Sequence, residues 1–344
     1  AVTDLFSIQQ DSSTGQYNYY SKVDGALANA LYLVNLDTVP VVAFATGHNE
    51  MLTVSDNLST FTGMLNDNNF EVKEFNMLTD EIPEDASIVV LGTPTTDYTS
   101  EELSKLEAYL GDEKMASSRT LYVTAYPTQS WADMPNLKSF LAEWGLEPQT
   151  GVLFESDMNN VLTTQDASPA YLFANVTDKV LSGTYNNVIA AAAAPVKRLF
   201  TANNDISTYS ILETSDTAYL TTTQEVEENP NTDTYTITGL AQRYMDNQGK
   251  ICANVDGNSM GYLGTFLGNS TFGNKDYTLD FIKNLTGTTD TRVGLVVNQT
   301  QTNTLDISAS SAVIQTIGLG LFTIVVPVAV LVIGLVIFLR RRHL

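Results

Sequence analysis

Cysteine and histidine are scarce in this sequence, which has one cysteine and two histidines among 344 residues. Cys252 alone cannot close an intrachain disulfide, so no internal cross-link stabilises the fold. One cysteine and two histidines also fall short of the four ligands that structural zinc sites usually take. A Cys–His catalytic pair would need Cys252 and His48, but Cys252 lies in an apolar segment, where cysteine usually behaves as a small buried hydrophobe.

Basic residues are few as well. The chain has 17 Lys and Arg against 39 Asp and Glu, and its formal net charge is −22. Such an acidic surface argues against nucleic acid, or an anionic membrane surface, as the main partner of the soluble part. The simplest interpretation of the acidity is that it keeps the protein soluble.

Sequence motifs of common enzyme classes are missing too. The nearest approach to a phosphate-binding loop is Gly268–Asp276, where Asn274 separates Gly273 from Lys275 and an Asp replaces the magnesium-binding hydroxyl. There is no Gly-x-Gly-x-x-Gly after the first apolar strand, no Gly-x-Ser-x-Gly and no His-Glu-x-x-His. The sequence therefore indicates no nucleotide hydrolysis, no cofactor and no metal, and favours a protein that is not an enzyme.

The end of the chain is apolar and uncharged. Residues 317–339 form an almost wholly apolar run, which as a helix would be ~35 Å long and would span a hydrocarbon layer of about 30 Å with some tilt. Arg340, Arg341 and Arg342 follow at once, and the last basic residue before the run is Arg292. The positive-inside rule then places the C-terminus in the cytosol and the bulk of the chain outside the plasma membrane.

Short apolar strands alternate with amphipathic helices in the first half of the chain. Apolar strands are expected over 40–46, 87–94 and 119–127, where each run is typical of a strand buried on both faces. A helix is expected between them from Thr99 or Ser100 to Gly111. This alternation predicts an α/β fold with an open, mostly parallel sheet and flanking helices, Rossmann-like in the flavodoxin or amidotransferase manner.

Changes in composition suggest six regions. They are a lead-in segment at 1–37, an α/β domain at 38–155, a second α/β part at 156–291 that completes or adjoins the sheet, a β-rich neck at 292–311, a transmembrane helix at 312–339 and a cytosolic tail at 340–344. The chain starts at Ala1 without an export signal. A removed signal peptide or an upstream membrane helix would each account for a domain outside the cell.

Polar residues lie at or just after the carboxyl ends of three of the expected parallel strands, if the apolar parts of the second and third are taken to end at Leu91 and Thr124. Because ligands bind at the carboxyl ends of strands in open α/β sheets, these residues form a candidate ligand site. Its members are Thr46, Gly47, His48, Glu50, Thr93 and Tyr126. The alternative is that Gly47 makes a turn while His48 and Glu50 hydrogen-bond the loop or cap a helix, and position in a fold alone does not decide between the two.

Asn-x-Ser/Thr sequons occur at Asn57, Asn175, Asn269, Asn284 and Asn298. In a chain rich in Asn and Thr such triplets arise by chance. They matter if the source organism has a pathway for N-glycosylation.

Taken in order, these segments resemble the GldG-like family, the gliding-motility-type auxiliary components of ABC transporters. Members have a Thr-Gly-His-Gly-Glu-like turn, matched by Thr46–Glu50, and a strand–loop–helix segment matched by Phe70–Leu110. Glu213–Leu220 and Gly273–Gly287 match two further family segments, and the ending of neck, membrane helix and Arg cluster is similar. The resemblance covers about 20–342.

Two positions depart from the family pattern. Asn49 stands where the family usually has Gly, and Cys252–Gly261 reads differently from the family's Gly-Asp-x-Asp-Phe turn. The resemblance implies a non-catalytic membrane subunit whose outside domain binds a substrate or partner protein. It would work with an ABC permease, separate or fused upstream, and a cytosolic ATPase, and would contact the bilayer through 317–339.

Two alternatives stay open. One is a membrane-anchored hydrolase or amidotransferase-like enzyme that uses His48. The other is a subunit of a glycosylation complex, because the chain is more distantly similar to the luminal subunit of the eukaryotic oligosaccharyltransferase. That protein shares a related α/β domain and a C-terminal membrane anchor.

Overall fold

The structure is a computed structural model of the whole chain, which divides into two compact units. One unit is Ala28–Val293, called the body below, and the other joins Ala1–Leu27 to Gly294–Leu344. The residues described are 6–10, 17–21, 23, 27, 39–111, 118–163, 168–223, 225–245, 249–288, 298–299 and 323–342.

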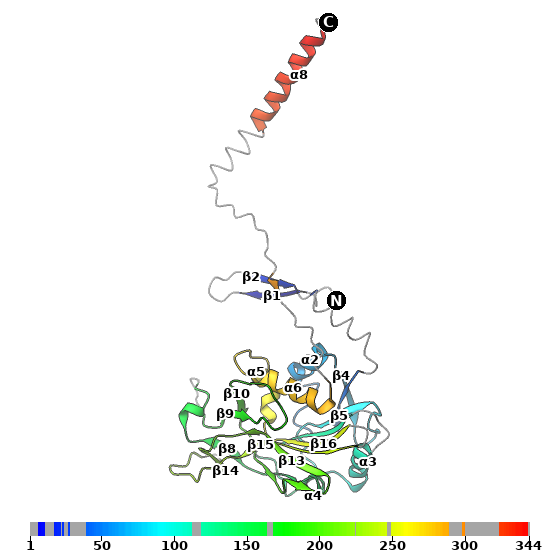
Figure 1. The fold of residues 1–344 in the computed structure, drawn as a ribbon, viewed down its shortest axis with the longest axis vertical. Coiled ribbons are helices and arrows are strands. Elements are labelled where there is room, and N and C mark those ends of the chain that lie inside the picture. The colour runs from blue at the N-terminus through cyan, green and yellow to red at the C-terminus, as the bar shows by residue number, and fades with distance from the viewer. Residues whose placement is uncertain are drawn as a thin grey trace. The chain divides into compact units, whose positions relative to one another are not determined.

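A ten-stranded sheet forms the centre of the body (Figure 1). Its order is β10-β9-β13-β15-β16-β6-β5-β3-β4, and β12 pairs with β13. The strands are β3 (Val41–Thr46), β4 (Glu71–Asn76), β5 (Ala86–Leu91), β6 (Arg119–Thr124), β9 (Tyr171–Val176), β10 (Val188–Ala191), β12 (Ala202–Asn203), β13 (Ile206–Glu213), β15 (Thr236–Tyr244) and β16 (Lys250–Asp256).

The predicted α/β class is confirmed, but the sheet is mixed. From β4 through β3, β5 and β6 to β16 every neighbouring pair is parallel. From β16 through β15, β13 and β9 to β10 every pair is antiparallel. The expectation of a mostly parallel sheet came from the regular strand–helix alternation, which holds only in the first half of the chain.

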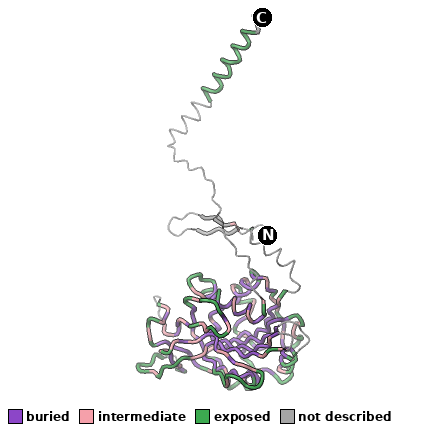
Figure 2. Tube along the Cα trace, in the orientation of Figure 1, coloured by how far each residue is buried: buried purple, intermediate pink, exposed green. Residues whose placement is uncertain are grey.

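Helices cover both faces of the sheet, so its central strands are buried (Figures 1 and 2). One face carries α2 and α6 and the other carries α3 and α4, each with its own apolar cluster. The helical elements are α2 (Ser59–Asp67), α3 (Ser100–Gly111), α4 (Pro135–Glu143), the 3-10 turns η2 (Met158–Asn160) and η3 (Ser259–Tyr262), α5 (Gly264–Leu267) and α6 (Asn274–Thr286). β5 and β6 are buried at every position, as expected for strands covered on both faces.

The two α/β parts expected at 38–155 and 156–291 contribute to one sheet. β16 returns late in the chain and pairs in parallel with β6, with Ala253 opposite Leu121. Two small sheets, each of two strands, flank this main sheet. They pair β7 (Leu146–Pro148) with β11 (Val196–Arg198), and β8 (Val152–Glu155) with β14 (Ala218–Thr221).

Asparagine side chains cap the outer edge of β10. The Asn274 Oδ1 accepts from the Ile189 backbone N–H at 2.9 Å, and the Asn274 Nδ2 donates to the Ile189 carbonyl at 2.8 Å. Asn258 makes the matching pair with the Ala191 N–H and the Ile189 carbonyl, at 2.9 and 3.0 Å. These amides satisfy backbone groups that would otherwise offer a free strand edge for pairing.

The other unit holds a three-stranded sheet and an apolar helix. Strand β2 (Tyr17–Ser21) pairs with β1 (Phe6–Gln10) and with β17 (Asn298–Gln299). The rest of the predicted lead-in at 1–37 that belongs to this unit lies outside the described residues except 23 and 27, as does the predicted neck at 292–311 except β17.

Helix α8 (Val326–Arg342) ends the described chain. Among the described residues one helical stretch, Thr323–Arg340, is long and apolar enough to cross a membrane, with a mean hydropathy of 2.6 and no buried residue. Arg340, Arg341 and Arg342 form its last turn. Residues 312–322 of the predicted transmembrane segment, and 343–344 of the predicted tail, lie outside the described residues.

Candidate functional site

The predicted site residues lie at the carboxyl ends of three neighbouring parallel strands. Thr46 ends β3, and Gly47, His48 and Glu50 follow it, whereas Thr93 follows β5. Tyr126 follows β6, and Gln129 joins it to the turn after β5 by accepting from the Tyr126 N–H and donating to the Pro94 carbonyl. The structure therefore gathers all six at one edge of the sheet, and the question is whether that edge is open.

His48 is buried, with 3% of its surface exposed. Its Nε2 lies 3.1 Å from the Glu102 Oε1, and its ring stacks on Tyr98 with centroids 3.8 Å apart. Its Nδ1 faces the Thr96 hydroxyl at 3.5 Å, and its backbone carbonyl accepts from the Thr95 and Thr96 N–H groups. Both ring nitrogens and one ring face are thus engaged inside the protein.

Glu102 belongs to a capping box at the start of α3. Its carboxylate accepts from the Thr99 N–H at 2.7 Å and from the Thr99 hydroxyl at 2.8 Å, while the Thr99 hydroxyl accepts from the Glu102 N–H. Burial alone would raise the pKa of Glu102, but the Thr99 hydrogen bonds and then His48 outweigh it and lower the pKa. His48 therefore ties the turn after β3 to the N-terminus of α3.

The sequence indicates the N-cap of this helix but not the contact between Glu102 and His48. The Thr-x-x-Glu spacing at Thr99 was the available signal for a capping box. Nothing in the spacing indicates that the same carboxylate reaches a histidine 54 positions earlier in the chain. Tyr98, which comes just before the cap, was missed for the same reason.

Thr93 and Glu50 also serve the turns themselves. Thr93 is fully buried with a left-handed φ of 57°, and its hydroxyl pairs with that of Thr124 at 2.7 Å. The Glu50 carboxylate accepts from the His48 backbone N–H, with both oxygens at 3.1 Å. Thr46 donates to the Phe75 carbonyl, and Gly47 has a φ of 115° that side chains rarely adopt.

The segment after this turn closes the edge. The Met51 N–H donates to the Thr93 carbonyl at 3.0 Å, and the Leu52 N–H donates to the Gly92 carbonyl at 2.9 Å. A Cβ at Gly92 would collide with the Leu52 carbonyl, so the segment lies directly on the end of β5. Leu52 and Leu58 fill the space beneath, leaving a cavity of about 10 Å³, room for about one water molecule.

A second buried polar cluster lies at the carboxyl end of β16, around Asp256. Its Oδ1 accepts from the Thr238 hydroxyl at 3.0 Å and from the Asn258 N–H at 2.9 Å. Its Oδ2 accepts from the hydroxyls of Tyr122 and Tyr262, which also contact each other. Burial raises the pKa of Asp256, although each of these hydrogen bonds opposes that shift.

This carboxylate lies in the segment where the sequence departs from the GldG-like pattern. Asp256 is 2% exposed, so it is part of the core and presents no acidic turn to solvent. Four donors converge on one carboxyl group, which is typical of a buried acid that organises its surroundings.

Cys252 is buried and its thiol is a poor nucleophile. Burial raises the pKa of Cys252 to about 11, although Lys250 and Thr120 oppose the shift. We expect the native protein to resist iodoacetamide at pH 8 and to react completely once it is unfolded. Labelling followed by mass spectrometry checks this. Fast modification of Cys252 in the native protein would contradict the expectation and would favour a mechanism that uses this thiol.

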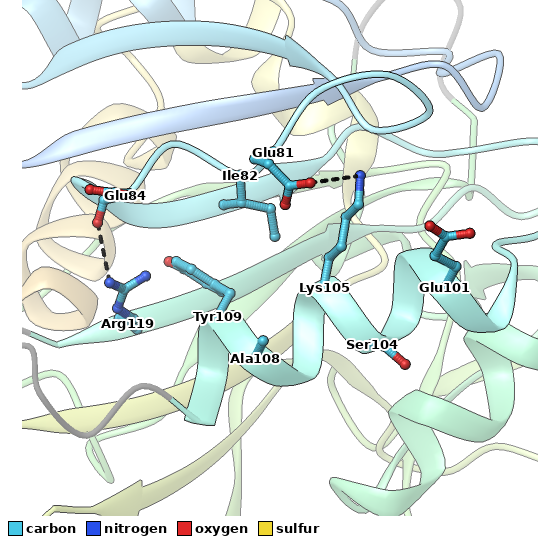
Figure 3. Close-up of a pocket in the computed structure, with 9 residues that line it drawn as sticks. All are labelled: Glu81, Ile82, Glu84, Glu101, Ser104, Lys105, Ala108, Tyr109 and Arg119. Carbon is cyan, nitrogen blue, oxygen red and sulfur yellow. Dashed lines mark hydrogen bonds and ion pairs between the residues drawn. The ribbon is translucent and has the colours of Figure 1, made fainter.

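An open groove of about 700 Å³ runs between α3 and the loop that joins β4 to β5 (Figure 3). Its lining residues are Glu81, Ile82, Glu84, Glu101, Ser104, Lys105, Ala108, Tyr109 and Arg119. Residues 77–85, which join the two strands, contain no helix, so α3 is left partly uncovered along this side.

The two cations of this groove are held by the protein. Lys105 donates to the Asp80 carbonyl at 2.9 Å and lies 3.8 Å from the Glu81 carboxylate. Arg119 donates to the Glu84 carbonyl at 3.2 Å and lies over the Tyr109 ring, 4.7 Å from its centroid. The rim carries exposed glutamates, so the groove offers an acidic margin above an apolar and aromatic floor.

Metal ligands do not gather elsewhere in the part of the chain that the structure describes, where no three His, Cys, Asp or Glu side chains are grouped to hold an ion.

Comparisons with known proteins show a likeness in fold to a solved structure. No family model matches the sequence, and no curated protein matches it. Among solved structures the chain is similar to one described as "mmIFT52 N-terminal domain", with 16% identity and a TM-score of 0.53. The match covers 73% of this chain and 98% of that one. At this identity, the chain shares an α/β fold with that domain.

Proposed function

We propose that the chain is a non-catalytic, membrane-anchored subunit of an ABC-type transporter. Its body lies outside the plasma membrane and binds a substrate or partner protein, α8 crosses the bilayer, and Arg340–Arg342 stay in the cytosol. Within the body, β4-β3-β5-β6-β16 follow the order 2-1-3-4-5 of a flavodoxin-like sheet, counted along these five strands.

The observation that carries the proposal is the closed carboxyl edge. In α/β enzymes of this strand order the crevice between β3 and β5 is where a small ligand would enter. Here Met51 and Leu52 bond to the backbone after β5 and cover that crevice. Recognition then falls to outer surfaces, and the groove of about 700 Å³ beside α3 is one such surface. The transporter partners rest on the resemblance to the GldG-like family.

Purification from native membranes tests this function. The full chain, tagged at its N-terminus and extracted in mild detergent, is expected to bring down an ABC permease and its ATPase. Ala108→Arg, which puts a long cation into the groove, is expected to reduce recovery of the partner at least about tenfold, as a loss of ~1.4 kcal/mol in binding. Glu107→Arg is the control, because Glu107 is an exposed neighbour on α3 that does not line the groove. Recovery of the chain alone would overturn the proposal.

One observation favours the enzyme alternative as a second candidate. His48 contacts a hydroxyl on one side of its ring and a carboxylate on the other. Its Nδ1 lies 3.5 Å from the Thr96 Oγ1, and its Nε2 lies 3.1 Å from the Glu102 Oε1. This is the order of a nucleophile, a base and an orienting acid. Its first distance is longer than the roughly 2.6–3.2 Å of a working pair, so we rank it second. Thr96→Ala should then abolish hydrolysis of an ester or amide substrate without changing the melting temperature.

A further inference from the structure

The sequons differ sharply in what their asparagine side chains do. A glycan joins the Nδ2 of Asn, so an acceptor site needs an exposed Asn whose amide is not already used by the fold. The structure describes the side chains of four sequon asparagines, namely Asn57, Asn175, Asn269 and Asn284.

Asn57 and Asn284 are committed to the fold. The Nδ2 of Asn57 donates to the Met51 carbonyl at 2.8 Å, and its Oδ1 accepts from the Thr53 N–H. The Nδ2 of Asn284 donates to the Val180 carbonyl at 3.2 Å, while its Oδ1 accepts from Lys250 at 2.8 Å. Both residues are half-buried, so a sugar on either would displace packed neighbours.

Asn175 is exposed but lies inside the sheet. It sits on β9 opposite Glu213 of β13. The hydroxyl of its sequon partner Thr177 is used by the fold, because it donates to the Ser210 carbonyl at 2.6 Å. The triplet is held extended in a ladder and cannot bend into a turn.

Asn269 lies in the loop between α5 and α6, and the whole triplet Asn269–Thr271 is exposed. Its Oδ1 accepts from the Thr271 N–H at 3.0 Å, which makes an Asx-turn. Its backbone carbonyl accepts from the Phe272 N–H at 3.1 Å, and the Phe272 ring lies against Phe266 with centroids 6.2 Å apart. The contact between Phe272 and Phe266 therefore anchors the C-terminal side of this turn on the body.

The reactive groups of this triplet are free. Within the described part of the chain, neither the Asn269 Nδ2 nor the Thr271 hydroxyl has a hydrogen-bond partner. The bent triplet thus presents the amide nitrogen and the hydroxyl to solvent together. Of the four described sequons this one alone combines exposure, a free amide and a turn.

We propose that Asn269 is an N-glycosylation site. The acceptor reaction forms a bond from Nδ2 to C1 of a sugar carried on a lipid phosphate or diphosphate. It breaks the C1–O bond to that carrier, and the amide proton leaves with the lipid phosphate. The modification goes beyond the proposed function and shares with it only the placement of the body outside the cytosol.

Mass spectrometry of the full chain from its native membranes tests the site. We expect a glycan on the Asn269 peptide and none on the Asn57 and Asn284 peptides. Asn269→Gln and Thr271→Ala should both lose the glycan, whereas the matched Thr271→Ser should keep it. Asn57→Gln and Asn284→Gln should also leave the Asn269 glycan in place.

An unmodified Asn269 would overturn the site, and so would a glycan at Asn57 or Asn284 in the folded protein. This failure is distinct from failure of the transporter proposal, because co-purification with a permease does not depend on the glycan. Protease digestion of sealed vesicles reports sidedness separately. An unmodified Asn269 on a body shown to lie outside would contradict the glycan alone.

Discussion

Replacing Asp256 by alanine is expected to lower the free energy of unfolding of the body by about 4 kcal/mol, since each buried donor left unpaired costs about 1–3 kcal/mol. The substitution takes the acceptor away from the hydroxyls of Thr238, Tyr122 and Tyr262 and from the Asn258 N–H. The two tyrosines still face each other, which keeps the total below the simple sum. For a body of this size the change corresponds to a melting temperature roughly 8–16 °C lower.

Tryptophan fluorescence can follow this unfolding in the full chain in detergent. The only two tryptophans of the sequence, Trp131 and Trp144, are both buried in the body. Asp256→Asn is the matched control, because it keeps an oxygen for Thr238 and Asn258 while removing the charge. We expect it to lie within about 1.5 kcal/mol of the natural protein, the range of a volume-conserving change. Equal losses from Ala and Asn would show that the carboxyl group itself is needed.

The difference in stability between the natural protein and Asp256→Asn changes with pH in a definite direction. The folded pKa of Asp256 is raised above its usual value of 3.8, so the folded state binds the proton more tightly than the unfolded state. The stability that this acid contributes is therefore present below pH 3.8 and is lost as the pH rises through the folded pKa. Relative to Asp256→Asn, the natural protein should gain stability as the pH falls.

Glu102→Ala is expected to cost about 3 kcal/mol, because a buried acid that satisfies several donors is removed. The change frees the His48 Nε2 and the Thr99 N–H at once and breaks the capping box, which alone is worth about 1 kcal/mol. The melting temperature should fall by roughly 6–12 °C. Glu102→Gln can still accept from Thr99 and donate to the imidazole, so its cost should be about half as large.

Glu101 provides the matched control for this prediction. It is exposed and lies in the same first turn of α3. Glu101→Ala should change stability by no more than about 0.5–1 kcal/mol, the value of a surface charge near a helix N-terminus. Similar losses for the two alanine variants would mean that removing a negative charge from the first turn of α3, and not losing the contacts of Glu102 with Thr99 and His48, explains the effect.

The sign of the pH effect is opposite to that of Asp256. The folded pKa of Glu102 is lowered from its usual 4.5, so its contribution is present above pH 4.5 and is lost as the pH falls through the folded pKa. The difference in the free energy of unfolding between the natural protein and Glu102→Gln should therefore become smaller as the pH falls. Urea unfolding at pH 7 and at pH 3.5 measures both acids with one protocol.

Local sequence pattern predicted much of the first half of the fold. The expected strands at 40–46 and 119–127 are β3 and β6, and the expected helix at Ser100 is α3. These elements follow from short apolar runs and from capping residues, which act over a few positions. In the second half the antiparallel pairing of the strands was not predicted, because β13 and β15 join the sheet through pairings that no local period encodes.

The sequence predicted the position of the candidate site, but it did not predict that this edge of the sheet is closed. Fold position placed His48 and Thr93 at the carboxyl edge, where the structure has them. Whether that edge is open depends on Met51 and Leu52, which bond to the backbone just after β5, some 40 residues later in the chain. Likewise the partner of His48 is Glu102, 54 positions away. Contacts of this kind are set by tertiary packing, so the sequence showed a site but not its closure.

Amide hydrogen exchange at Met51 and Leu52 tests most directly whether this edge is closed. Their N–H groups donate to the carbonyls after β5, and exchange requires those two bonds to break. If the segment is a permanent part of the body, their opening free energy should come within about 2 kcal/mol of the free energy of global unfolding. Exchange near the rate of an unprotected loop, an opening free energy of about 0, would contradict the account. The carboxyl edge would then be open to a ligand, and His48 would return as a candidate functional residue.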